Sequence, residues 1–388
     1  MTGPLTGMRV VEIASAAPAP FACMMLADMG AEVLVVDRTD KVARGGRRPR
    51  DPLARGRRSI GVDMKAPDGV KIVQRLVEQA DVVVEGFRPG VMERLGLGPD
   101  ELLALNPGLI YARMTGFGQE GPLAPRAGHD INYIAVAGAL DPIGRAGEKP
   151  HAPLNLVGDF GGGGMLLAVG ILAGLVERAR SGRGQVVDAA MVDGAALLSA
   201  FIHGLRDQGL WADARGTNML DGGAPFYDTY ETSDGRYMAV GALEGRFYRQ
   251  LLQGLELGDD PSLPAQMDRE RWDELRTTIA EVFLSRTRAE WTEVFDLLDA
   301  CVSPVLTPAE VANSPHAVAR DGFVDVDGLV QPAPAPRFSR TPSNHPTRPR
   351  LAGEDTVDAL VDWGISSEEV ADLVRIGVLA SSAEEVTA

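Results

Sequence analysis

The first 116 residues alternate short apolar runs with helical patterns. Successive segments predict strands over 9–13, 32–37, 59–64, 81–87 and 109–116, and helices over 20–29, 69–78 and 99–105. Short apolar strands separated by helices are typical of βαβ units, in which the strands lie parallel and helices cover both faces of the sheet. We therefore predict an α/β fold with a Rossmann-like parallel sheet.

The loop after the first strand argues against a dinucleotide. Residues 14–20 contain no glycine, whereas a phosphate-binding G-x-G-x-x-G turn needs glycine for close approach of the backbone. Asp37, at the end of the second strand, would suit the ribose of NAD but is a weak signal alone. We predict no nicotinamide cofactor.

The pattern changes near residue 207. Before it lie a long apolar helix over 162–180, a strand over 185–191 and a helix over 195–205. After it, Ser233-Asp234-Gly235 joins two β-patterned runs, 226–232 and 236–243, as in a hairpin. Further segments follow in order: helices over 246–255, 269–285 and 289–298, an extended connector over 332–349, and two acidic helices over 356–363 and 367–376.

Composition narrows the class of protein. The net charge of −16 argues against nucleic-acid binding, and no run of eighteen apolar residues predicts a membrane span. Residues 1–8 lack the plan of a signal peptide, so we expect a cytoplasmic protein. Two cysteines exclude a disulfide framework, Cys23 being expected in the core, and the five histidines show no metal spacing.

Seven arginines lie between residues 44 and 58: Arg44, Arg47, Arg48, Arg50, Arg55, Arg57 and Arg58. This arginine island is either a solvated loop or the rim of a pocket for a polyanionic small molecule. Both interpretations are open at this point.

Three residues are candidates for chemistry. Asp159 precedes Gly161-Gly162-Gly163-Gly164 at the start of the long apolar helix, where it is either a helix cap or a reactive carboxylate beside exposed amides. His129 opens a helix after a polar loop and is either structural or a general base. Glu244 ends an apolar strand and is either a solvated turn residue or part of a site.

Several motifs resemble the family III CoA-transferases, or CaiB/BaiF proteins, and among them the α-methylacyl-CoA racemases. They are the segments 127–133 (AGHDINY), 153–160 (PLNLVGDF), 182–189 (GRGQVVDA), 218–225 (NMLDGGAP) and 299–306 (DACVSPVL). The N-terminal block, the run 88–95 (RPGVMERL) and the acidic tail resemble the wider family. The resemblance covers nearly the whole chain.

The resemblance implies a large Rossmann-like domain, residues 1–206 with 331–388 returning to it, and a smaller α+β domain, 207–330. It implies an interlocked homodimer that acts on 2-methyl-branched acyl-CoA thioesters without metal or redox cofactor. His129 and Asp159 would be the catalytic bases, with Glu244 assisting the histidine. CoA contacts would be Arg38, Val62, Asp63, Met64, Lys65, Gly128, Asp130, Ile131, Asn132 and Tyr133.

This chemistry suits the residue types. Racemisation needs one base on each face of the α-carbon and a donor for the enolate oxygen, for which the amides of residues 159–164 are candidates. The alternatives are a family III CoA-transferase with Asp159 as nucleophile, and a CoA-binding protein without catalysis. Two departures from the racemases are Gly245-Arg246 after Glu244, where proline and glutamine are common, and Ala19, where glycine is common.

Overall fold

The structure, a computed structural model, describes residues 2–15, 17–42, 50–258, 260–343 and 345–382. It contains two compact units. The larger comprises residues 1–137, 154–198 and 315–388, and the smaller comprises 138–153 and 199–314. The smaller unit thus spans 199–314, where the sequence suggested 207–330, and it includes the segment 138–153, which the sequence did not single out.

A seven-stranded sheet forms the centre of the larger unit, in the order β12-β3-β2-β1-β4-β5-β6. The strands are β1 (Arg9–Ile13), β2 (Glu32–Arg38), β3 (Arg58–Val62), β4 (Val82–Glu85), β5 (Ile110–Thr115), β6 (Gln185–Ala190) and β12 (Leu379–Ala380). All neighbours pair in parallel except β12, which is antiparallel to β3. The order 3-2-1-4-5-6 is that of a Rossmann fold, as predicted.

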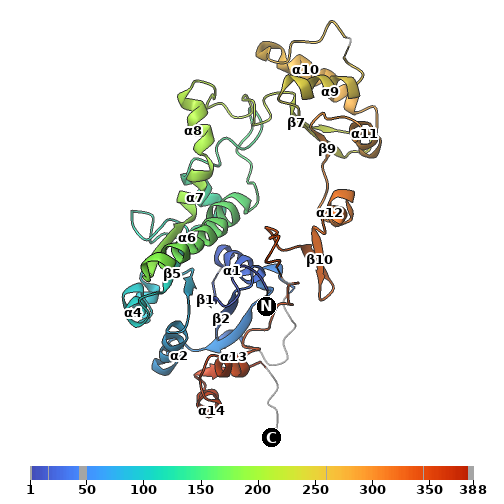
Figure 1. Cartoon of the computed structure of the whole chain (residues 1–388). Helices are drawn as coiled ribbons and strands as arrows, with labels where there is room; N and C mark the ends of the chain where they lie inside the picture. The colour runs from blue at the N-terminus through green and yellow to red at the C-terminus, as the bar shows by residue number, and fades with distance from the viewer. Residues whose placement is uncertain (1, 16, 43–49, 259, 344, 383–388) are drawn as a thin grey trace. The chain divides into compact units, whose positions relative to one another are not determined.

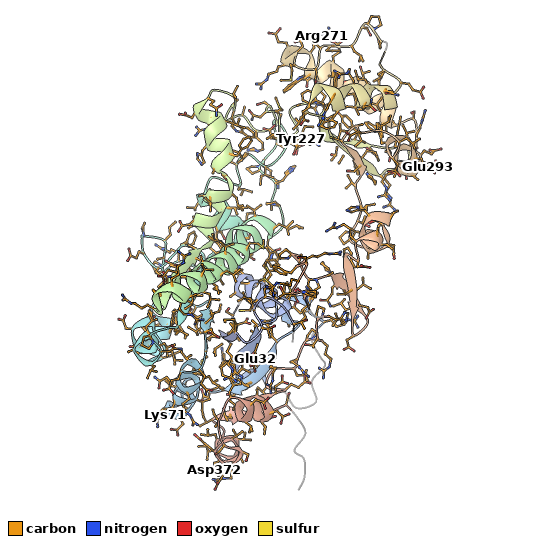
Figure 2. The ribbon with its side chains drawn as sticks, viewed as in Figure 1. Glu32, Lys71, Tyr227, Arg271, Glu293 and Asp372 are labelled. Carbon is orange, nitrogen blue, oxygen red and sulfur yellow. The ribbon has the colours of Figure 1, made fainter. Side chains whose placement is uncertain are left out.

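Helices cover both faces of this sheet (Figure 1). One core contains side chains from α2 (Pro67–Val77), α4 (Pro99–Leu105), α13 (Thr356–Asp362) and α14 (Ser367–Arg375). The other contains side chains from α1 (Pro18–Asp28) and α6 (Leu166–Ser181), and α1 includes the buried Cys23. Lys71 on α2 and Asp372 on α14 point away from the sheet (Figure 2).

The long apolar helix begins earlier than the sequence indicates and in another geometry. Leu156–Met165 is a π-helix that continues directly into α6, so Asp159 lies within the first turn. The segment Leu156–Ser181 is long and apolar enough to cross a membrane by composition alone, a test that core helices also pass. Its residues Leu167, Ala168 and Ile171 are buried against the sheet, so we interpret it as a core helix.

The glycine run allows close packing of this π-helix. A Cβ atom added at Gly162 would lie 2.6 Å from the backbone nitrogen of Ala195, on α7 (Met191–Leu198). One added at Gly164 would lie 2.7 Å from the carbonyl oxygen of Pro18, on α1. Glycine is needed where two backbones approach this closely. Packing therefore explains the run, which the sequence had suggested for ligand binding.

The remaining elements of the larger unit are short. They are the helices α3 (Val91–Arg94), α5 (Asp130–Val136) and α12 (Pro315–Ala319), and the hairpin of β10 (Phe323–Val326) and β11 (Leu329–Pro332). Short 3-10 turns lie at Thr39–Lys41 and Pro52–Ala54. The acidic tail returns to this unit, since Leu379 pairs with Val62.

The smaller unit packs helices against a three-stranded antiparallel sheet. The sheet order is β7 (Tyr227–Glu231), β8 (Tyr237–Gly241), β9 (Val302–Pro304). The helices are α8 (Ala200–Asp207), α9 (Gly245–Gly254), α10 (Trp272–Phe283) and α11 (Arg288–Phe295), with 3-10 turns at Arg269–Arg271 and Val311–Asn313. Phe226, Phe283 and Trp291 are fully buried in its core. The predicted hairpin is thus confirmed, whereas the predicted helix 195–205 is interrupted at Ser199.

Candidate active site

A cavity of about 500 Å³ lies at the carboxyl ends of the parallel strands. Its lining includes Pro18 after β1, Gly86 after β4 and Gly116 after β5. The chain reverses direction across the sheet between β1 and β4, and ligands of open α/β sheets bind at this switch point. The topology therefore indicates a binding site here.

The cavity brings together two of the predicted catalytic residues, His129 and Asp159. His129 is the N-cap of α5, and its main-chain N–H donates to the side-chain oxygen of Asn132 at 3.1 Å. Asn132 thus provides an acceptor for the main-chain N–H of His129. The imidazole of His129 is exposed.

Asp159 lies on a different element, the π-helix, and is partly buried. Burial raises the pKa of its carboxyl group above the usual range. An N–H of Asn155, 3.2 Å from Oδ2, lowers the pKa, the negative charge of Asp130 raises it, and His129 lowers it. A carboxyl group with a raised pKa suits a residue that must both hold and release a proton.

Tyr133 lines the same cavity as the two candidates. Its hydroxyl donates to the carbonyl of Gly128, and its ring meets Phe117 edge-on with centroids 5.0 Å apart. A Cβ atom at Gly116 would lie 2.1 Å from the Tyr133 ring. The ring is therefore fixed, and it fixes the loop that carries His129.

The amides proposed for an enolate oxygen are already engaged or lie beyond the first turn of the helix. Residues 159–164 lie inside the π-helix; the N–H of Asp159 donates to Asp130 Oδ1 at 2.6 Å and that of Phe160 to the carbonyl of Asn155. The amides of Asp159 and Phe160 therefore already donate within the protein, which the sequence did not indicate.

The predicted CoA contacts lie along the same edge of the sheet. Arg38 and Val62 end β2 and β3 and are direct register partners. Arg38 and Lys65 are exposed, and Arg38 is paired with Asp40, whereas the side chains of Val62 and Met64 are buried. Asp63 Oδ1 accepts the N–H of Lys65 at 3.0 Å. The hydrophobic members could thus meet a ligand only through their backbone.

Only some residues of the second segment predicted to contact CoA, 128–133, line the cavity. Gly128, His129 and Tyr133 line the cavity, and Ile131 and Asn132 are exposed on α5. Asp130 is only 5% exposed and faces the backbone of Asp159. This placement favours a supporting role for Asp130 over the predicted contact with CoA.

The arginine island is largely structural where it is described. Arg55 is buried and binds both oxygens of Asp28, at 3.2 and 2.6 Å. Arg57 is buried against Glu12, and Arg58 pairs with Asp362 at 2.8 Å. The interpretation as a pocket rim is therefore wrong for these three. Arg50 is exposed, and Arg44, Arg47 and Arg48 lie outside the described residues.

Other cations line the cavity instead. Arg88, after β4, and Arg126, in the loop before His129, are both exposed on its wall. Neither residue was among the candidates that the sequence suggested. The position of Arg88 just after a parallel strand was the available signal, since loops at that edge bind ligands.

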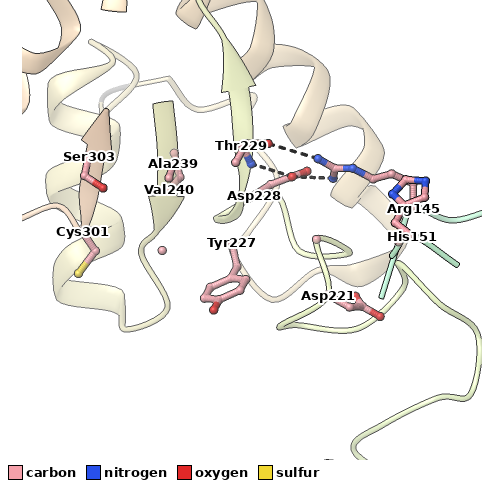
Figure 3. A pocket seen from close by; sticks show the side chains of 13 residues that line it. Arg145, His151, Asp221, Tyr227, Asp228, Thr229, Ala239, Val240, Cys301 and Ser303 are labelled. Atoms are coloured by element: carbon pink, nitrogen blue, oxygen red, sulfur yellow. Dashed lines mark hydrogen bonds and ion pairs between the residues drawn. The ribbon is translucent and has the colours of Figure 1, made fainter. Parts of the chain in front are cut away.

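Glu244 belongs to the smaller unit. It is the exposed N-cap of α9, and its side chain makes no capping hydrogen bond. A second cavity of about 530 Å³ in this unit contains Tyr227, Cys301 and an ion pair of Arg145 with Asp228 at 2.6 Å (Figure 3). Glu244 does not line it.

Comparison with known proteins supports one family. The family model for CoA-transferase family III matches residues 5–356. Mouse α-methylacyl-CoA racemase is 50% identical over 371 residues, covering 95% of this chain and 96% of that protein. The human α-methylacyl-CoA racemase is 48% identical over 380 residues, covering 97% and 98%.

The fold agrees with a solved member. The crystal structure of a CaiB/BaiF family protein from Brucella suis matches with a TM-score of 0.80 at 27% identity, covering 94% of this chain and all of that one. Together with the parallel sheet and the motifs around His129 and Asp159, these matches show that the chain belongs to CoA-transferase family III.

Proposed function

We propose that this protein is an enzyme that racemises 2-methyl-branched acyl-CoA thioesters at the α-carbon. The observation that carries the proposal is the pair His129 and Asp159, which line one cavity from two elements, α5 and the π-helix. Relatives about half identical over nearly the full length are α-methylacyl-CoA racemases.

The reaction needs two groups, one that removes a proton from the α-carbon and one that returns a proton to it. One base removes the α-proton, and the electrons of the C–H bond move into the thioester carbonyl to give an enolate. The other base then donates its proton to the opposite face, which forms the new C–H bond. The raised pKa of Asp159 allows it to hold the proton that it must donate.

The enolate oxygen needs a hydrogen-bond donor. Since residues 159 and 160 donate within the protein, the remaining amides near His129 are those of the first turn of α5. Within that turn the N–H groups of Asn132 and Tyr133 donate to the carbonyl of His129, so the candidates are the N–H groups of Asp130 and Ile131, at the very start of the helix. We propose this turn, in place of the glycine run, as the donor.

CoA would lie along the carboxyl edge of the sheet. Arg38 and Lys65 are exposed at the ends of β2 and β3, and Arg88 lines the cavity. A guanidinium group can donate two parallel hydrogen bonds to the oxygens of one phosphate. CoA carries a diphosphate and a 3′-phosphate. No metal or redox cofactor is required by this chemistry.

Glu244 and the homodimer are further parts of the proposal. The Glu244 side chain makes no capping bond and is exposed, so it is available to pair with His129. We propose an interlocked homodimer for this pairing and a cytoplasmic enzyme.

The test uses one epimer of a 2-methylacyl-CoA in D₂O without an acceptor acid. NMR follows the α-proton and the epimer ratio. Racemisation predicts loss of the α-proton signal together with drift to a mixture of epimers. If both stay constant, and CoA moves only when a free carboxylic acid is added, Asp159 is a transferase nucleophile and the proposal is wrong.

A further inference from the structure

One buried carboxylate beside the proposed site has no part in the reaction as described. Asp130 is 5% exposed. Its Oδ1 accepts the main-chain N–H of Asp159 at 2.6 Å, and its Oδ2 is buried with no hydrogen-bond partner among the described residues. Burying a carboxylate oxygen without a donor is costly. Packing alone would be satisfied by an apolar residue, so the charge itself calls for an explanation.

The neighbouring backbone is shaped to admit this carboxylate. A Cβ atom added at Gly158 would lie 2.5 Å from Asp130 Oδ1 and 2.8 Å from Cγ. Only glycine at this position lets the carboxylate reach the N–H of Asp159. The contact therefore depends on residues from both α5 and the π-helix.

The charges around Asp159 are few. Asp130 and His129 are the two that act on its pKa, after the larger effects of burial and of Asn155. Other elements pack against the π-helix and carry further titratable groups, namely Cys23 and Asp28 on α1, Tyr133 on α5, Glu177, Arg178 and Arg180 on α6, Asp193 on α7, Tyr111 and Arg113 on β5, and Asp188 on β6. Of the groups that the structure describes, Asp130 is the one negative group that also touches Asp159 directly.

We propose that Asp130 is a positioning residue for Asp159, which anchors the backbone of that base and places a second negative charge beside its carboxyl group. A nearby like charge favours the protonated form of a carboxyl group. Asp159 must carry a proton in one direction of racemisation, so this inference rests on the proposed function.

The test compares pH profiles of kcat/KM for α-proton exchange in wild type and Asp130→Asn. The asparagine keeps an oxygen that can accept the Asp159 N–H but removes the charge. A two-base racemase works with one proton on the His129–Asp159 pair, so the acid limb reports the uptake of a second proton by the pair. Loss of the Asp130 charge makes protonation of Asp159 less favourable, so we expect the acid limb to move to lower pH.

A matched control is Asp81→Asn. Asp81 Oδ2 also accepts a main-chain N–H, that of Arg9, at 2.8 Å, but Asp81 precedes β4 at the other end of the strand. The acid limb of the kcat/KM profile of Asp81→Asn should coincide with that of wild type. Asp130→Ser is a second neutral variant. Its side chain is shorter, so its oxygen does not reach the position of Oδ1, which accepts the N–H of Asp159. Misplacing Asp159 should lower its kcat/KM by on the order of 100-fold.

Each outcome has a distinct meaning. A wild-type enzyme without exchange overturns the proposed function itself. Exchange in wild type with an unmoved acid limb in Asp130→Asn overturns the electrostatic role of Asp130. If both neutral variants fail to fold, Asp130 serves stability alone, and the inference is also overturned.

Discussion

Replacing Gly162 by alanine tests the role of the glycine run in packing. The added Cβ would lie 2.6 Å from the nitrogen of Ala195 and 2.9 Å from the carbonyl carbon of Gly194, whereas ordinary contacts begin at 3.4 Å. Both neighbours are backbone atoms, so no side-chain rotation relieves the clash. The π-helix and α7 must separate by roughly the missing 0.8 Å.

The expected loss of stability follows from this overlap. Overpacking a core costs about 1–3 kcal/mol, and a backbone clash lies at the upper end. A unit of roughly 250 residues has an unfolding entropy of about 0.5 kcal/mol/K, so 3 kcal/mol lowers Tm by about 6 °C. Thermal unfolding followed by circular dichroism measures this shift.

Gly204→Ala is the control. Gly204 lies inside α8, and an added Cβ meets nothing within 4 Å. Alanine is favoured over glycine in a helix by about 0.5–1 kcal/mol, so Tm should stay or rise slightly. If Gly162→Ala melted within about 1 °C of wild type and yet lost α-proton exchange, the glycines would serve the ligand, and the packing explanation would be refuted.

Two further substitutions separate structural from binding arginines. Arg55→Ala leaves the buried Asp28 without its partner and should reduce the free energy of unfolding by about 3–5 kcal/mol in urea titrations. A loss below about 1 kcal/mol would contradict the assignment of this pair. Arg88→Ala removes an exposed cation from the cavity wall and should raise KM for the acyl-CoA by about 10- to 100-fold with kcat nearly unchanged. Arg58→Ala, whose guanidinium is paired with Asp362, should leave KM unchanged, and equal effects in both variants would argue against CoA binding by Arg88.

The central sheet could be predicted because its signals are local. The apolar strands beginning at Arg9 and Glu32 and the helix over 99–105 follow periodicities that hold within a few residues. The motifs around His129 and Asp159 also led to two residues that the fold brings to one cavity.

Features that depend on distant partners could not be predicted. The carboxylates that pair with the buried Arg55 and Arg57 belong to Asp28 on α1 and Glu12 on β1, which lie 27 and 45 residues away in the sequence. The segment 138–153 joins the smaller unit through contacts such as Arg145 with Asp228. π-Helices are rare and the glycine-rich segment 156–165 gives a weak helix signal, so the helix start at Leu156 was missed, and with it the engagement of the Asp159 amide.

The most direct test of the two-base mechanism follows each epimer of a 2-methylacyl-CoA separately in D₂O, with wild type, His129→Gln and Asp159→Asn. In the proposed mechanism each base faces one side of the α-carbon, so each variant should keep deuterium incorporation with at most one epimer and should not interconvert the two. If either variant interconverts the epimers at the wild-type rate, the residue it replaces is not a catalytic base, and the pairing of His129 with Asp159 is wrong.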